Sequence, residues 1–88
     1  KIPDFLGEGR VANNGLGFKW QNRHGQYIVR IMQGNKNSQW PCQQIPYVRI
    51  NNNGQVIGRS GQILRDKFAA EAHIPLEEWI KWRNWYQP

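Results

Sequence analysis

The side chains of this chain that could do chemistry are two histidines and two arginines set among apolar residues. His24 lies in NRHG and His73 in EAHIP, while Arg30 and Arg49 each interrupt a β-like run, YIVRIM and YVRI. An imidazole exchanges protons near neutral pH, and guanidinium groups stabilise phosphate charge. With Lys67 they would suffice for RNA cleavage without a metal ion, because RNA supplies its own nucleophile, the ribose 2′-hydroxyl.

The two histidines have different alternatives. His24 stands among turn-forming residues, so we expect it to be a turn residue. His73 lies between two segments of helix-forming residues. It could cap the first of them, or it could be the general acid or base of a site, and the sequence leaves both roles open.

Several other classes of site are excluded. Two-metal nucleases need clustered carboxylates, but residues 1–65 contain only Asp4 and Glu8. The single Cys42 excludes an internal disulfide and a cysteine-clustered zinc site. The sequence also lacks a Walker loop, a GxGxxG fingerprint and a serine-centred elbow motif. We therefore expect neither a metal nor a cofactor.

The positive charge is concentrated in the first three quarters of the chain. Residues 1–65 carry nine Lys and Arg, whereas residues 66–88 carry three Lys and Arg against four Asp and Glu. A basic domain of this size is commonly a polyanion binder. The alternative is a solvated face with surplus cations.

The length of 88 residues predicts one domain, residues 1–88, because such a chain can bury one modest core. No apolar run approaches the roughly 20 residues of a membrane-spanning helix. Five tryptophans supply large apolar area, which favours a folded globule.

Two hairpins are predicted before residue 64. Residues 18–21 alternate between apolar and polar side chains, and residues 26–33 are rich in β-branched residues. The turn NRHG lies between the two segments. Residues 47–50 and 55–58 flank NNNG, in which Asn53-Gly54 is a strong hairpin signal. Residues 59–63 offer another turn and a short last strand, and residues 1–17 an extended segment with turns.

One or two helices are predicted after about residue 64. Leu64, Phe68 and Ala72 recur at helical spacing, and Pro75 with two glutamates suits a first helical turn. Leu76, Trp79 and Ile80 should pack on the sheet. The predicted fold class is α+β: a small antiparallel sheet of about four strands with one or two C-terminal helices packed on one face.

Alternation along the strands places the two arginines. If Tyr27, Val29 and Ile31 face the core, then Ile28, Arg30 and Met32 face away; likewise Val48 and Ile50 face the core while Tyr47 and Arg49 face away. Arg30 and Arg49 should then share a face and could bind one anionic partner. The alternative is that each pairs with a carboxylate such as Glu71 or Asp66.

The loop GNKNSQWPCQQIP, residues 34–46, is rich in amides and contains one aromatic residue. Asn35, Asn37, Ser38 and Trp40 suit hydrogen bonding to base edges and stacking on an unpaired base. Such residues also suit a loop that satisfies its own backbone, and Trp40 could instead plug one end of the core.

The segments VRIMQGNKNSQWPCQQIPYVRI, NGQVIGRSGQI and EAHIPLEEW resemble a C-terminal toxin module of large secreted bacterial proteins, of the Rhs-repeat and contact-dependent-inhibition type. The resemblance runs from about Phe18 to Trp79. Lys36 and Gln39-Trp40 depart from the family's pattern. The positions that the resemblance marks are Arg30, Gly34, Asn35, Asn37, Ser38, Tyr47, Arg49, His73 and Pro75.

The resemblance implies a nuclease, since many such modules are nucleases and a frequent fold among them is the barnase, EndoU, colicin and RelE class of ribonuclease. That fold usually begins with helices, whereas the helices predicted here follow the strands. The expected function is a metal-independent ribonuclease toxin domain that cleaves cytoplasmic RNA in a target cell. Its chain would be part of a secreted or cell-surface protein, monomeric and without membrane association. A cognate acidic immunity protein would bind it.

Within this hypothesis His73, Arg30 and Arg49 are catalytic, and Asn35, Asn37, Ser38, Trp40 and Tyr47 bind substrate. Two other functions remain compatible with the sequence. One is a non-catalytic nucleic-acid-binding module, and the other is a structural or protein-interaction domain of a bacterial surface protein.

Overall fold

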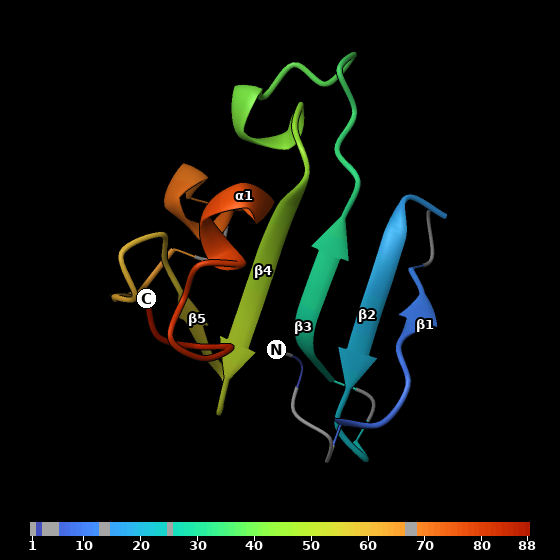
Figure 1. Ribbon diagram of the computed structural model, residues 1–88, viewed down its shortest axis with the longest axis vertical. Helices are drawn as coiled ribbons and strands as arrows, with labels where there is room; N and C mark the ends of the chain where they lie inside the picture. The colour runs from blue at the N-terminus through green and yellow to red at the C-terminus, as the bar shows by residue number, and fades with distance from the viewer. Residues whose placement is uncertain (1, 3–5, 13–14, 25, 67–68) are drawn as a thin grey trace.

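One antiparallel sheet dominates the computed structural model, which describes residues 2, 6–12, 15–24, 26–66 and 69–88. Strands β1 to β5 lie side by side in chain order (Figure 1). Strand β6 follows β5 at the edge, and β7 pairs with β4. The strands are β1 (Arg10–Val11), β2 (Gly17–Gln21), β3 (Tyr27–Met32), β4 (Tyr47–Asn52), β5 (Gln55–Ile57), β6 (Ile63–Leu64) and β7 (Ile74–Pro75). The helical elements are short: the 3-10 turns η2 (Pro41–Gln43) and η3 (Ala70–Ala72) and the α-helix α1 (Leu76–Trp79).

Both predicted hairpins are present. In the β2–β3 turn the Asn22 side-chain oxygen accepts hydrogen bonds from the backbone N–H groups of His24 and Gln26, at 2.9 and 3.1 Å. In the β4–β5 turn Asn53 and Gly54 have φ values of 55° and 80°. Two successive positive φ values are the requirement of a type I′ turn, which explains why Asn-Gly stands there.

The sheet has more strands than the predicted four. The additional pairings are short: β1 joins the β2 edge, β6 joins β5, and β7 joins the Tyr47–Val48 end of β4. A strand of two residues carries almost no period-2 signal, because it shows only one alternation. The α+β class is correct in the coarse sense, but the fold is mostly sheet.

The helix predicted from about Leu64 is wrong at its start. Ile63 and Leu64 pair with β5 instead, and Ala70–Ala72 form a single 3-10 turn; Phe68 lies outside the described residues. Pairing with an open sheet edge has overridden helix propensity, which is a weak preference of tenths of a kcal/mol per residue. Where the structure describes this segment, its helix formers do not make an α-helix.

The helix predicted after Pro75 begins where expected and is short. Its first turn contains Glu77 and Glu78, which suit the positive end of a helix. Trp79 is buried and Leu76 packs against the core, as predicted. Ile80, however, is 59% exposed, so the prediction that it packs on the sheet is wrong. The helix α1 ends at Trp79, before its apolar face extends beyond one turn.

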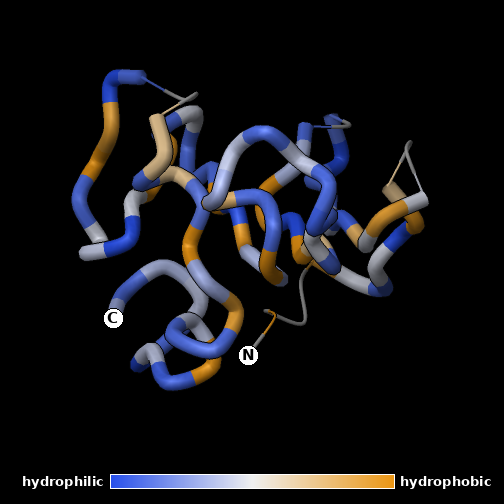
Figure 2. The backbone as a smooth tube through the Cα atoms, turned by 90° about the horizontal axis from the view of Figure 1, so that it is seen from above, coloured by the Kyte–Doolittle hydropathy of each residue, from blue (hydrophilic) through white to orange (hydrophobic). Residues whose placement is uncertain are grey.

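The C-terminal segment lies on one side of the sheet (Figure 2). The core lies between this segment and the sheet. Val29, Val48, Ile50 and Ile74 are fully buried. The side chains that cover them include Leu6, Trp79 and Trp82, and the Trp79 indole N–H donates to the Trp85 carbonyl at 3.1 Å. No helix in the described ranges is long and apolar enough to cross a membrane.

Candidate nucleic-acid interface

Arg30 and Arg49 are directly opposite residues of β3 and β4. Directly opposite residues of an antiparallel pair project from the same face of the sheet. Their strand neighbours Val29, Val48 and Ile50 are fully buried on the other face. The prediction that the two arginines share the non-core face is confirmed.

The Arg30 guanidinium carbon lies 5.5 Å from the centre of the Tyr27 ring, a distance at which a cation is attracted to the ring face. The prediction that Tyr27 faces the core is therefore wrong. The register of β2 and β3 shifts between Trp20 and Gln21, so that Gln21 is opposite Tyr27. This irregularity reverses the alternation at the start of β3, and Ile28 packs against the core instead.

The two arginines belong to a longer row of basic residues. Lys19 on β2 is opposite Arg30, and Arg10 on β1 is opposite Lys19. The row Arg10–Lys19–Arg30–Arg49, called the basic row below, therefore crosses four adjacent strands on one face. Arg10 and Lys19 were not among the predicted site residues, although the alternation in FKWQ puts Lys19 on the other face from Phe18 and Trp20.

His73 lies at the β4 end of the basic row. Ile74 is opposite Val48, so that His73, the residue before β7, lies toward Arg49. Its ring makes an edge contact with Tyr47, with centroids 5.0 Å apart, and its Nε2 lies 3.3 Å from the Gln43 amide nitrogen. The backbone N–H of His73 also closes η3 on Ala70, so the capping role and a place in the candidate site are both present.

At the His73 end of the basic row, the pKa shifts of His73 and Tyr47 favour the uncharged form of each side chain. Burial, and then the positive charge of Arg49, lower the pKa of His73 below its usual value, against a smaller opposite effect of the Ala69 and Ala70 carbonyls. Burial raises the pKa of Tyr47, although Arg30 and Arg49 oppose this shift. At neutral pH His73 is therefore an uncharged base and Tyr47 a protonated phenol.

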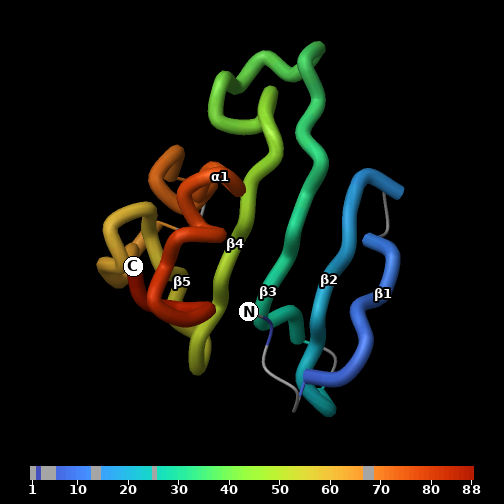
Figure 3. The backbone as a smooth tube through the Cα atoms, viewed as in Figure 1, coloured from blue at the N-terminus to red at the C-terminus, as the bar shows by residue number. Residues whose placement is uncertain are grey.

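His73 and Arg49 line one cleft of about 390 Å³ together with Trp40, Cys42, Gln43 and Ala70. Trp40 is 56% exposed, so it does not plug the core. The loop between β3 and β4 extends beyond the ends of the strands (Figure 3). Trp40 lies on this loop and lines the cleft. A cation, a neutral imidazole and an exposed indole thus meet at one opening.

The loop of residues 34–46 owes its shape to its own polar groups. Gly34 has φ = 83°, and a Cβ there would lie 2.5 Å from the Ile45 carbonyl carbon, so that a glycine is needed where the two ends of the loop meet. The Asn35 side-chain oxygen accepts from the Asn37 N–H at 2.9 Å, and the Ser38 hydroxyl oxygen accepts from the Trp40 N–H at 3.1 Å.

These bonds favour the self-satisfying loop for Asn35 and Ser38. Both residues still line a second, smaller cavity of about 170 Å³ that also includes Met32, Gly34 and Tyr47. Asn37 is exposed on the loop. Of the predicted site residues, His73, Arg49 and Trp40 share the cleft, Arg30 and Tyr47 are beside it, and Asn37 is not brought to it. Lys67 lies outside the described residues.

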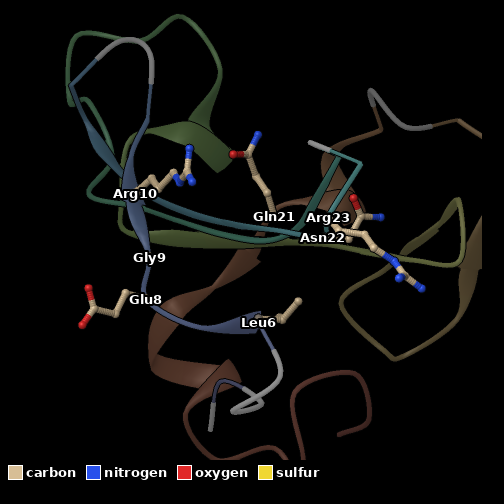
Figure 4. Close-up of a pocket in the computed structure, with 7 residues that line it drawn as sticks. All are labelled: Leu6, Glu8, Gly9, Arg10, Gln21, Asn22 and Arg23. Atoms are coloured by element: carbon tan, nitrogen blue, oxygen red, sulfur yellow. The ribbon is translucent and has the colours of Figure 1, made fainter.

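The opposite end of the basic row borders another cavity, of about 640 Å³. In Figure 4 Arg10 and Gln21 extend from the same side of the ribbon, whereas Glu8 points away from them and Leu6 projects on the other side. Arg10 therefore presents its charge on the face of the basic row, while Leu6 belongs to the core. None of the described residues that line this cavity is a histidine.

Buried polar atoms without a hydrogen-bond partner gather on the same face. In the part of the chain that the structure describes, these include Arg30 Nε and Asn51 Oδ1. Native proteins rarely leave such atoms unsatisfied, and functional sites are one place where they do. Within the described ranges, no three His, Cys, Asp or Glu side chains are grouped so that they could hold a metal ion.

Comparison with known proteins gives no relative for this chain. No family model matches it, and no curated protein or solved structure matches it significantly. The functional assignment therefore rests on the cleft and the basic row.

Proposed function

We propose that this domain is a metal-independent ribonuclease whose reaction centre is the cleft that contains His73 and Arg49. The observation that carries the proposal is the meeting of an uncharged imidazole and a guanidinium in one cleft, with a second guanidinium directly opposite on β3. A neutral base and fixed positive charge are the two groups that RNA transesterification requires of an enzyme.

The proposed reaction is attack of the ribose 2′-oxygen on the adjacent phosphorus. His73 Nε2 accepts the 2′-hydroxyl proton, in the tautomer that has its own proton on Nδ1. The P–O5′ bond breaks, leaving a 2′,3′-cyclic phosphate and a 5′-hydroxyl. Tyr47, which its raised pKa keeps protonated, supplies the proton to the leaving oxygen. Arg49 and Arg30 stabilise the negative charge that develops on the phosphate oxygens.

The substrate 2′-hydroxyl would enter the cleft at the contact between Gln43 and His73. The Gln43 amide lies 3.3 Å from Nε2, and in the stated tautomer its N–H donates to that atom. A 2′-hydroxyl entering the cleft would replace this donor. Trp40 is available to stack on an unpaired base, and Asn35, Asn37 and Ser38 remain proposed substrate contacts on the loop.

The biological setting is proposed on the resemblance alone. The domain would be the toxin module of a secreted or cell-surface bacterial protein, active on RNA in the cytoplasm of a target cell. An acidic immunity protein would neutralise it by covering the basic row.

The decisive experiment is incubation of the purified domain with total RNA in EDTA. We expect cleavage to cyclic-phosphate ends, loss of cleavage in His73→Ala and His73→Gln, and full cleavage in His24→Ala, whose histidine is exposed in a turn. Circular dichroism would show which variants are folded. Binding of RNA without cleavage by the unmodified domain would refute the enzyme and establish the non-catalytic binding module, which the length of the basic row also favours.

A test in cells follows from the toxin assignment. Induced expression in a bacterium should arrest growth and fragment RNA, and His73→Gln should do neither at equal protein level. Normal growth with folded, unmodified domain present would contradict the toxin role.

A further inference from the structure

We infer that the basic row is a track for the backbone of single-stranded RNA, so that nucleotides on only one side of the cleaved bond contribute to binding. This inference rests on the proposed function for the position of the cleaved bond. The track itself rests on the strand register, which places Arg10, Lys19, Arg30 and Arg49 one after another across β1 to β4.

The length of the basic row suits several consecutive phosphates. Adjacent strands are about 4.8 Å apart, so that three steps from β4 to β1 span about 14 Å. A cation occurs at every step. A chain of phosphates is a ligand whose charges repeat along a line in the same way.

The neighbours of the basic row favour a single strand over a duplex. The Arg30 guanidinium carbon lies 5.5 Å from the centre of the Tyr27 ring. Tyr47 makes an edge contact with the His73 ring and is close enough to Arg30 and Arg49 for their charge to oppose the rise in its pKa that burial causes. Proteins that bind single strands combine a line of cations with aromatic rings on which unpaired bases stack. In a duplex the bases are already stacked on each other, so these rings would have no partner.

The charge on the two sides of the cleft is unequal. The basic row continues from Arg49 toward β1. On the other side of His73, the cavity that continues past η3 is lined by Glu71 and by Arg59, and the Arg59 guanidinium is paired with Glu78. Phosphates on that side would meet an exposed carboxylate and a cation already neutralised. The electrostatic part of the binding energy should therefore come from one side.

The first test measures affinity for a single-stranded DNA oligonucleotide, which lacks the 2′-hydroxyl and is not cleaved, as a function of salt. Each neutralised phosphate of a single strand contributes a slope of about −0.7 in log K against log salt. Four contacts predict a slope of about −3, and Arg10→Gln and Lys19→Gln should each make it shallower by about 0.7. Arg83→Gln removes an exposed charge from the C-terminal segment and should leave the slope unchanged.

The second test measures kcat/KM on DNA strands that contain one ribonucleotide. Three nucleotides are added on the 5′ side, on the 3′ side, or on both. We expect one of the two single extensions to raise kcat/KM severalfold and the other to leave it unchanged, and we expect the gain to disappear in Arg10→Gln. Equal gains from both extensions would overturn the inference.

The outcomes separate the track from the ribonuclease. Absence of cleavage with the predicted salt slopes would refute the ribonuclease and leave the track. Cleavage with slopes that Arg10→Gln and Lys19→Gln do not change would refute the track and leave the ribonuclease. Equal dependence on the basic row for duplex DNA, or for polyglutamate, would also refute the track, since the surface would then bind polyanions without regard to their form.

Discussion

Arg30 and Arg49 stand directly opposite each other on β3 and β4, on the face of the sheet that lacks the core. Lys19 is opposite Arg30 on its other side. Like charges that are opposite in a sheet destabilise the folded state. Their juxtaposition therefore has consequences for stability as well as for binding.

Arg30→Gln should make the protein more stable. It removes repulsion with two neighbours, each worth about 0.2–1 kcal/mol, and a buried Nε without a partner among the described residues; it loses the contact with Tyr27, worth about 0.5–1 kcal/mol. We expect a net gain of about 0.5 kcal/mol in the free energy of unfolding at low salt, measured by urea denaturation. Because salt screens repulsion, the gain should shrink in high salt; a loss above about 1 kcal/mol would contradict this account.

The free energy of unfolding should fall on acidification because of His73. Its pKa is lower in the folded protein than in the unfolded chain, where it is about 6.5. The unfolded chain therefore binds the proton first, and stability present above pH 6.5 is lost as the pH falls toward the folded pKa. Denaturation series from pH 8 to pH 5 should show this loss in the unmodified protein and in His24→Gln, and His73→Gln should reduce it. An unchanged profile in His73→Gln would show that another group is responsible.

Cleavage should keep its rate down to mildly acidic pH. A base with a lowered pKa remains unprotonated below pH 6.5, so that kcat/KM should decline only below that value. The pH profile on a defined oligonucleotide checks this. Gln43→Ala removes the amide that lies next to His73 Nε2 and should change the pH at which kcat/KM declines. Gln44→Ala, on the same loop, should leave that pH unchanged. A profile that falls already above pH 7 would argue against His73 as the base.

Gly34→Ala should destabilise the protein more than Gly54→Ala. Both glycines have φ near 80°, but an added Cβ at Gly34 meets the Ile45 backbone at 2.5 Å, whereas at Gly54 it meets nothing within 4 Å. Positive φ alone costs about 1 kcal/mol for alanine. The difference between the two variants in urea denaturation therefore isolates the close approach of the loop ends, and equal losses would show that the loop can open without penalty.

Trp40→Ala should weaken RNA binding with little effect on folding. The side chain is 56% exposed, so we expect a change in unfolding free energy within about 0.5 kcal/mol. Loss of a stacked base costs about 1–3 kcal/mol of binding, measurable by fluorescence anisotropy of a labelled oligonucleotide. Trp82→Ala is the contrasting variant: Trp82 is 7% exposed in the core, and its loss should cost about 3–5 kcal/mol of stability. Unchanged RNA affinity in Trp40→Ala would remove Trp40 from the site.

Local signals in the sequence were sufficient for several elements. The Asn53-Gly54 turn follows from the positive φ that both residues accept, and the start of α1 from Pro75 and the glutamates after it. That Arg30 and Arg49 each face away from the core follows from period-2 alternation within each strand, but their position opposite each other depends on the pairing of β3 with β4. The turn, the start of the helix and the alternation within each strand depend on residues that are close together in the chain.

Only the tertiary structure decided the rest. The bulge that moves Tyr27 away from the core, the pairing of Leu64 with β5 and the exposure of Trp40 each depend on which distant segment is adjacent. The basic row depends on the register of three separate strand pairs, and the place of His73 on the return of β7 to β4. The sequence by itself determined which side chains alternate and where the chain turns, because those preferences are local. Packing between segments far apart in the chain decided which cations form the basic row and which imidazole lies at its end.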